Sequence, residues 1–146
     1  IAGAGPQREE LQQQVASRGL EGSIEFLGYV PEEEKIALLH AADTFVLPSR
    51  QEGFGIAVLE AMATGTPVVV NDLAVLRDLV PDAGGTFVDA SDRAAFADAL
   101  LDALQLSEAE RQKRGNINHT RATEYSWTSV TDQVEGIYAE YINHEE

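Results

Sequence analysis

The stretch that decides the fold is "RQEGFGIAVLEAMATGTPVVV", residues 50–70. A glycine-rich loop leads into an apolar helical segment, and the run "TPVVV" after it is apolar enough for a central strand of a parallel sheet. The helical segment is apolar all round, so we expect it to be buried on most of its sides. Glu60 is the exception within it, and a buried carboxylate needs a partner because leaving it unpaired is costly.

Outward from this stretch, short apolar runs alternate with helical patterns along the whole chain. This alternation predicts an α/β fold with a Rossmann-like parallel sheet flanked by helices. The expected strands are "IAGAG" at 1–5, "SIEFLG" at 23–28, "TFVLP" at 44–48, "TPVVV" at 66–70 and "GGTFV" at 84–88.

Start and stop signals place the helices between these runs. A helix from Pro6 to about Arg18 is expected to stop at Gly19, and Gly65 is expected to end the apolar helix. The expected N-caps of the last three helices are Ser91 or Asp92, Ser107 in the capping-box pattern "SEAE", and Ser126. We expect a sheet domain over residues 1–106 and a helical tail of the same domain over 107–146, with the first strand truncated at Ile1.

The composition excludes several partners. Acidic residues outnumber basic ones 25 to 10, for a net charge of −15, so nucleic acid and anionic membranes are repelled. No apolar run is long enough to span a membrane, and no secretory signal opens the chain. The absence of cysteine excludes disulfides and thiolate metal sites and fits a cytoplasmic protein. We expect no metal site, because His119 and His144 lie without paired ligands and His40 resembles a surface histidine.

The loop "EGFGI" has the features of an anion site. Gly53 and Gly55 permit unusual backbone angles and let a ligand approach the backbone closely. The amides of Phe54, Gly55 and Ile56 would point out of a helix N-terminus, which suits a phosphate. The loop also comes after the carboxyl end of an expected strand, where ligands bind in open α/β sheets.

Two carboxylates flank this loop. Glu52 stands just outside it, and Glu60 lies about 9 Å along the helix at a rise of about 1.5 Å per residue. A nucleotide sugar matches this layout, with phosphate at the amides and hydroxyl-bearing rings at the carboxylates. The spacing leaves another interpretation open, in which Glu60 pairs with an arginine distant in sequence and the glycines only shape a turn. Tyr125 and Trp127 are expected to be packing anchors.

At this point the sequence resembles a known family. "EGFGIAVLEAMATGTPVVV" resembles the E-x7-E signature of retaining nucleotide-sugar glycosyltransferases of the GT-B fold, the family 4 or "group 1" type. "IAGAGP", "FLGYVPEEEKIALLHAADTFVLPS" and "YSWTSVTDQVEGIY" are similar to other segments of the C-terminal domain of that family, in the same order. The resemblance covers essentially the whole chain and implies the C-terminal, donor-binding half of a GT-B fold with a helical C-terminal tail.

The resemblance also implies roles for individual residues. Glu60 would accept hydrogen bonds from the ribose hydroxyls, and Glu52 would be the catalytic residue that contacts the donor sugar near its reacting carbon. The other substrate-binding positions would be Gly53, Phe54, Gly55 and Ile56 at the sugar or diphosphate, Gly28, Tyr29 and Val30 at the base, and Thr64 at ribose or phosphate.

The implied activity is transfer of a hexose from a nucleotide diphosphate-sugar to a glycan, lipid or small-molecule acceptor. Retention in this family is thought to proceed by front-face attack, and the resemblance implies neither a metal nor another cofactor. Two alternatives remain: a non-catalytic nucleotide-binding module, and a nucleotide-sugar epimerase of the same fold.

The sequence departs from the family pattern in two ways. The basic residues that neutralise the diphosphate in the family, and the acceptor domain with its catalytic histidine, would precede Ile1. We therefore expect that domain as a partner within the same protein and this chain alone to be inactive. After "VVV", Ala74 and Val75 replace the usual glycine pair and Asp78 replaces the usual Glu, which leaves the sugar undetermined. The nucleotide, the acceptor and the oligomeric state are undetermined too.

Overall fold

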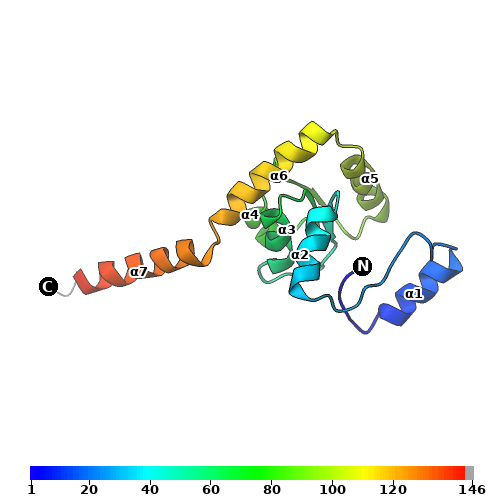
Figure 1. Cartoon of the computed structure of the whole chain (residues 1–146), viewed down its shortest axis with the longest axis horizontal. Coiled ribbons are helices and arrows are strands. Elements are labelled where there is room, and N and C mark those ends of the chain that lie inside the picture. The colour runs from blue at the N-terminus through cyan, green and yellow to red at the C-terminus, as the bar shows by residue number, and fades with distance from the viewer. Residues whose placement is uncertain (144–146) are drawn as a thin grey trace. The chain divides into compact units, whose positions relative to one another are not determined.

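The computed structural model describes residues 1–143 and divides the chain into two compact units, Ile1–Leu38 and Leu39–Glu146. The first unit contains α1 (Arg8–Ser17), and α2 (Glu32–Ala41) begins in it (Figure 1). The second unit contains β1 (Phe45–Leu47), α3 (Ile56–Ala63), β2 (Val68–Asn71), α4 (Ala74–Leu79), β3 (Gly85–Val88), α5 (Arg93–Leu104), α6 (Glu108–Thr123) and α7 (Trp127–Asn143).

In the first unit, the segments predicted as strands at 1–5 and 23–28 pair with each other only briefly. The Gly3 amide donates to the Gly28 carbonyl at 2.6 Å, and the Leu27 amide donates to the Ile1 carbonyl at 2.9 Å. The two segments share one parallel bridge, between Ala2 and Gly28. The prediction of two regular strands is therefore wrong, because an isolated pair of short segments is too small to sustain a ladder. Gly19, with φ +65°, comes after α1 as predicted.

The second unit is organised around a parallel sheet. Its strand order is β1-β2-β3, with Val46 opposite Val69 and Val69 opposite Thr86. These strands confirm the runs predicted at 44–48, 66–70 and 84–88. β2 is central and all of its residues are buried, as its three successive valines indicate, and Asn71 ends the strand.

The residues of β2 point alternately to two apolar clusters, one on each face of the sheet. Val68 and Val70 belong to a core with residues of α3, α4 and α6, whereas Val69 belongs to a second cluster with Ala99 and Ala103 of α5. Helices therefore cover both faces, which is the predicted Rossmann-like α/β class.

The predicted helix caps are present. Asp92 accepts hydrogen bonds from the amides of Ala94 and Ala95 at 3.1 and 3.0 Å. The hydroxyl of Ser126 accepts from the Ser129 amide at 3.1 Å at the start of α7. Such side chains satisfy first-turn amides that have no partner within the helix.

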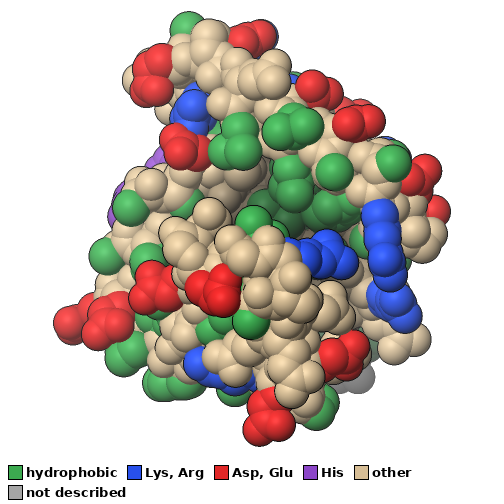
Figure 2. Space-filling view, turned by 90° about the vertical axis from the view of Figure 1, so that its right-hand side faces the viewer, with side chains coloured by type: hydrophobic (Ala, Val, Ile, Leu, Met, Phe, Trp, Pro, Cys, Tyr) green, Lys and Arg blue, Asp and Glu red, His purple; other side chains and the backbone are tan. Residues whose placement is uncertain are grey.

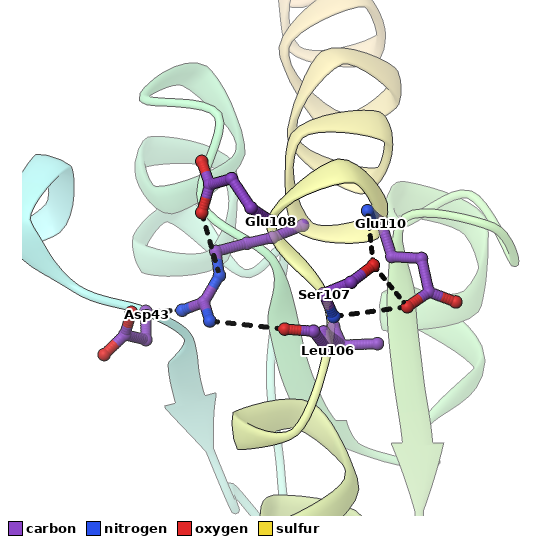
Figure 3. A network of polar contacts seen from close by, with 6 residues as sticks. Asp43, Leu106, Ser107, Glu108 and Glu110 are labelled. Atoms are coloured by element: carbon purple, nitrogen blue, oxygen red, sulfur yellow. Dashed lines mark hydrogen bonds and ion pairs between the residues drawn. The ribbon is translucent and has the colours of Figure 1, made fainter.

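A polar network fixes the beginning of α6 (Figure 3). Ser107 and Glu110 form the predicted capping box, in which the Glu110 amide donates to the Ser107 hydroxyl at 3.3 Å and the Ser107 amide donates to the Glu110 carboxylate at 3.2 Å. Arg111 pairs with Asp43, which lies just before β1, and donates to the Leu106 carbonyl at 3.5 Å. The start of α6 is thus tied to the entrance of the sheet.

Asn118 ties the middle of α6 to the amino edge of the same sheet. Its side chain is fully buried, and its Nδ2 donates to the carbonyls of Thr66 and Gly84, both at 3.0 Å. Thr66 and Gly84 lie just before β2 and β3 in the chain, so one amide holds the entrances to two strands.

The last helix differs from the others in what it buries. α7 leaves its apolar side chains exposed: Trp127, Val130, Val134, Ile137, Tyr138, Tyr141 and Ile142. The expectation that Trp127 packs is wrong, since it is 86% exposed, whereas Tyr125 is partly buried against the core. The predicted division at residues 106 and 107 stays a prediction.

The acidic side chains do not gather in one place on the face drawn in Figure 2. They lie on many parts of that face. Within residues 1–143, no helix is both long and apolar enough to cross a membrane.

Candidate functional site

Of the two glycines in the loop between β1 and α3, Gly55 has the unusual backbone angle that the sequence predicts and Gly53 does not. Gly55 is the N-cap of α3 and has φ +90°, in the left-handed region. A Cβ at this position would lie 2.8 Å from Cδ2 of Leu76 and 3.2 Å from Cδ2 of Leu79. Gly55 is therefore required both by its backbone angle and by the close packing of α4. Gly53 is exposed, and nothing lies within 4 Å of a Cβ placed there.

This loop lies at the carboxyl edge of the sheet. β1 runs into the loop and α3 returns the chain to the start of β2, so the N-terminus of α3 belongs to the edge where parallel strands end. Its first amides have no partner within the helix, and the helix dipole adds partial positive charge. An anion site at Phe54, Gly55 and Ile56 stays a prediction.

The side chains around this helix terminus differ in exposure. Glu52 is partly buried and lies beside Gly55, because its Cγ is 3.8 Å from the Cβ position of that glycine. Phe54 and Ile56 are exposed, by 44% and 64%. The exposed side chains of Phe54 and Ile56 and the carboxylate of Glu52 thus belong to the residues at the N-terminus of α3.

An aromatic pair attaches the loop to the end of α6. The ring of Phe54 meets that of Tyr125 edge-on, with centroids 5.7 Å apart and planes at 73°. The Tyr125 hydroxyl accepts a hydrogen bond from Arg121 at 3.0 Å, and Arg121 also donates to the Asp78 carbonyl at 2.8 Å. The loop, α4 and α6 therefore share one set of contacts.

The helix that carries Glu60 is buried on one side only. Val58, Ala61 and Met62 are fully buried, while Ile56 and Ala63 are exposed. The expectation of burial on most sides is wrong, because the sheet and the neighbouring helices cover a single face of α3.

Glu60 itself is partly buried. It lies four residues after Ile56, about 6 Å along the axis at the usual rise per residue. Glu52 therefore lies at the N-terminus of α3, and Glu60 lies near the middle of the helix.

Thr64 lies at the other end of α3, about 12 Å from Ile56 by the helical rise. It is the C-cap, and its hydroxyl donates to the Ala61 carbonyl at 2.8 Å and lies 2.9 Å from the Thr66 hydroxyl. Thr66 in turn donates to the Leu39 carbonyl at 2.7 Å. The structure does not bring Thr64 to the carboxyl edge where Glu52 lies.

The three residues expected at the base belong to the first unit. Gly28 is buried with φ +71°, and a Cβ there would lie 2.8 Å from Nη1 of Arg8. Tyr29 is 85% exposed and Val30 is partly buried. Their participation in a common site with the second unit stays a prediction.

Asn71 is a residue of this edge that the sequence interpretation missed. It is buried at the end of β2, where its Nδ2 donates to the Ser49 carbonyl at 2.8 Å and its Oδ1 accepts from the Ala90 amide at 2.8 Å. The sequence does carry a signal for it. Asn71 follows three successive valines, at a position where another apolar residue would continue the buried strand.

Two further carboxylates come after the strands at this edge. Asp72 accepts a hydrogen bond at 2.7 Å from Nη2 of Arg77, and this bond holds the pKa of Asp72 below its usual value. Hydrogen bonds from the Ser91 hydroxyl and amide, at 2.7 and 2.8 Å, lower the pKa of Asp89 in the same way. Arg77 also lies over the ring of Phe87, 4.7 Å from its centroid. Asp72 and Arg77 stand on either side of Ala74 and Val75 in the chain, where these two residues replace the family's glycines.

Among residues 1–143, no group of three or more His, Asp or Glu side chains is placed to hold a metal ion. His119 lies on the exposed surface with its Nδ1 2.7 Å from the Ala63 carbonyl oxygen. His144 lies outside the described residues. Independence from metal stays a prediction.

The fold and this edge define an α/β domain of the kind that binds ligands beyond the carboxyl ends of its strands. The chain matches the family described as glycosyl transferases group 1 over residues 1–120, and it belongs to that family. The family membership confirms the resemblance identified from the E-x7-E stretch.

The sequences and structures of individual known proteins are also similar to this chain. The chain is 38% identical over 131 residues to the O-antigen chain mannosyltransferase B of Escherichia coli, an alignment of 89% of this chain and 34% of that protein. Its structure is similar to that of sucrose-phosphate synthase from Thermosynechococcus elongatus, with a TM-score of 0.83 and 27% identity over 97% of this chain and 37% of the other. It shares the fold of Anabaena HepE in complex with UDP and glucose, with a TM-score of 0.82 and 21% identity over 95% and 39% of the two chains.

The chain spans about a third of the length of the curated relatives it matches.

Proposed function

We propose that this chain is the donor-binding domain of a retaining glycosyltransferase that uses a nucleotide diphosphate-sugar. The observation that carries the proposal is the loop–helix unit from Glu52 to Glu60. Glu52 lies beside Gly55 at the N-terminus of α3, and Glu60 follows about one turn along that helix, in a chain of the glycosyl transferases group 1 family.

The chemistry of this unit suits the parts of such a donor. The first amides of α3 and the positive end of its dipole would hold the diphosphate. Glu60, within the helix, would accept hydrogen bonds from the two ribose hydroxyls, and Glu52, beside Gly55, would contact the sugar near its reacting carbon. As the bond to the sugar breaks, charge grows on the leaving diphosphate, and fixed amides stabilise it without reorganising.

The relatives support the choice of donor class. The Escherichia coli relative is named as a mannosyltransferase, and the Anabaena protein of the same fold was solved with UDP and glucose. A hexose and a nucleoside diphosphate are therefore the groups to test first. Since this chain spans about a third of its relatives, we propose that the acceptor is bound by another part of the intact protein.

The net charge of the chain, −15, opposes an anionic donor. The helix amides would therefore act together with cationic groups of the intact protein. The cytoplasmic location stays a prediction.

The proposal is tested on the intact protein by titration calorimetry with UDP, GDP and ADP and their glucose or mannose conjugates. Glu60→Ala is expected to weaken binding of the preferred nucleotide by at least about tenfold to hundredfold, because the loss of even one hydrogen bond to a charged group costs about 1.5–3 kcal/mol. Asp98→Ala, which removes an exposed carboxylate of α5, serves as the control and should bind as wild type. Equal affinity of wild type and Glu60→Ala would contradict the proposed site.

One observation favours a second candidate, a non-catalytic nucleotide-binding module. Ala74 and Val75 stand where the family has two glycines, and α4 already begins at Ala74. Tight binding of a nucleotide without sugar transfer to any acceptor by the intact protein would support this candidate over the enzyme.

A further inference from the structure

The buried amide of Asn71 joins the two loops that flank β2 at the carboxyl edge of the sheet. Ser49 lies two residues after the end of β1, and Ala90 lies two residues after the end of β3. Asn71 ends the strand between them and bonds to both, each at 2.8 Å. One side chain thus connects the exits of all three strands.

Only an amide satisfies both partners from this position. The Ser49 carbonyl needs a donor, the Ala90 amide needs an acceptor, and a carboxamide carries one of each on adjacent atoms. A carboxylate keeps the acceptor and loses the donor. A serine hydroxyl is too short to reach both loops.

The Ser49 bond matters because Glu52 is only three residues further along the chain. The loop is next fixed at Phe54, by its ring contact with Tyr125, and at Gly55, which packs against Leu76. The segment carrying Glu52 is therefore suspended between the Asn71 anchor on one side and the N-terminus of α3 on the other.

We propose that Asn71 is a positioning residue: by holding the Ser49 carbonyl it sets the place of Glu52 relative to the first amides of α3. This inference rests on the proposed function, since it concerns the end of the site that would bind the sugar and diphosphate. Asn71 acts there through the loop, without touching the donor.

The test uses the variant Asn71→Asp in the intact protein. The substitution keeps the size of the side chain and the acceptor for Ala90, and it turns an oxygen toward the Ser49 carbonyl in place of the Nδ2 donor. Asn118→Asp is the matched control, because Asn118 is the buried amide that donates to two carbonyls at the opposite, amino edge of the same sheet. Both variants lose thermal stability, but only the first disturbs the loop.

The readout is a comparison of two kinds of ligand, measured well below the unfolding temperature of each variant. The nucleotide sugars are UDP-glucose, GDP-mannose and ADP-glucose. The partial ligands are UMP, GMP and AMP, which keep the ribose and lack the hexose and the second phosphate. For Asn71→Asp we expect affinity and kcat with the preferred nucleotide sugar to fall about tenfold, the usual effect of losing one buried hydrogen bond. Affinity for the matching monophosphate should not change, since Glu60 is within α3 and independent of the Ser49 bond.

Each outcome decides a different point. If wild type binds none of the nucleotide sugars, the proposed function fails and this inference with it. If wild type binds and Asn71→Asp retains the affinity and kcat of Asn118→Asp, only the positioning role is overturned. Equal losses for nucleotide sugar and monophosphate would also overturn it, because they indicate general damage.

Two milder variants keep the test decisive if the Asn71→Asp or Asn118→Asp protein does not fold. Asn71→Ser leaves a small polar side chain and should show the same selective loss. Thr44→Val removes a hydrogen bond from the Thr44 hydroxyl to the Pro67 carbonyl, 3.1 Å long at the amino edge, and should show no such loss.

Discussion

Gly115 of α6 lies directly against the carbonyl group of Gly65, the residue next after the C-cap of α3. A Cβ at Gly115 would come within 2.2 Å of that oxygen, closer than any real contact. Gly65 has φ +76°, so it too is held in a conformation that favours glycine. At this point α6 packs against the backbone that follows α3. The contact therefore fixes the C-terminal end of the helix that carries Glu60.

Gly115→Ala should therefore destabilise the protein by about 2–3 kcal/mol. Overpacking against a fixed backbone costs more than the gain in helix propensity, about 1 kcal/mol. Thermal or urea denaturation measures the difference. Gly136→Ala in α7 is the control, because nothing lies within 4 Å of its Cβ position, and it should be neutral or slightly stabilising. A stable Gly115→Ala protein would show that α3 and α6 are not in this close contact.

The two glycines of the candidate loop should respond differently to alanine. Gly55→Ala is expected to lower stability by about 2 kcal/mol or more, since alanine resists a positive φ and its Cβ would press on Leu76. Gly53→Ala has open space around it and should leave the unfolding temperature unchanged. If a donor approaches this backbone, Gly53→Ala still weakens binding of the nucleotide sugar, as titration calorimetry would show. Equal unfolding temperatures for the two variants would contradict the assigned backbone.

Much of the second unit could be predicted from local signals in the sequence. Features that depend on residues close together in the chain could be predicted without knowing the fold. They are the apolar run at 66–70, the turn at Gly65 and the caps at Asp92, Ser107 and Ser126. The predicted strand at 23–28 failed for the opposite reason. "SIEFLG" has the composition of a strand, but a strand also needs a neighbour, and in the first unit it finds only one bridge, at Gly28.

The candidate site was predictable only where its residues are close together in the chain. The carboxylates and glycines between Glu52 and Glu60 form one motif, and their joint placement results from a loop and a helix. Asn71 could not be found in this way. Its partners Ser49 and Ala90 lie 22 and 19 residues away in the chain, and only the pairing of three parallel strands brings them to it. The exposure of Trp127 was missed likewise, since packing of an aromatic residue depends on distant partners.

The contact between Phe54 and Tyr125 should contribute measurable coupling. Edge-to-face aromatic pairs are worth about 0.5–1.5 kcal/mol beyond the area that they bury. A double-mutant cycle with Phe54→Leu, Tyr125→Leu and the double variant should give a coupling energy near 1 kcal/mol in the free energy of unfolding, as is usual for such pairs. Additive effects of the two substitutions would show that the rings do not interact. Phe54→Leu is also expected to weaken nucleotide-sugar binding, since the ring fixes the loop.

The capping box of α6 should make stability depend on pH in the acid range. Hydrogen bonds from the Ser107 hydroxyl and amide hold the pKa of Glu110 below its ordinary value of 4.5. A carboxyl whose pKa is lower in the folded protein stabilises the fold above the unfolded pKa, and this stabilisation is lost as the pH falls through the folded value. Glu110→Gln should therefore unfold at a lower temperature than wild type at pH 7, and the difference should shrink as the pH falls below about 4.5. In a Ser107→Ala background the same comparison should show a weaker pH dependence, because the largest cause of the shift is gone. A difference between wild type and Glu110→Gln that stays constant from pH 7 to pH 3 would contradict the assignment of this cap.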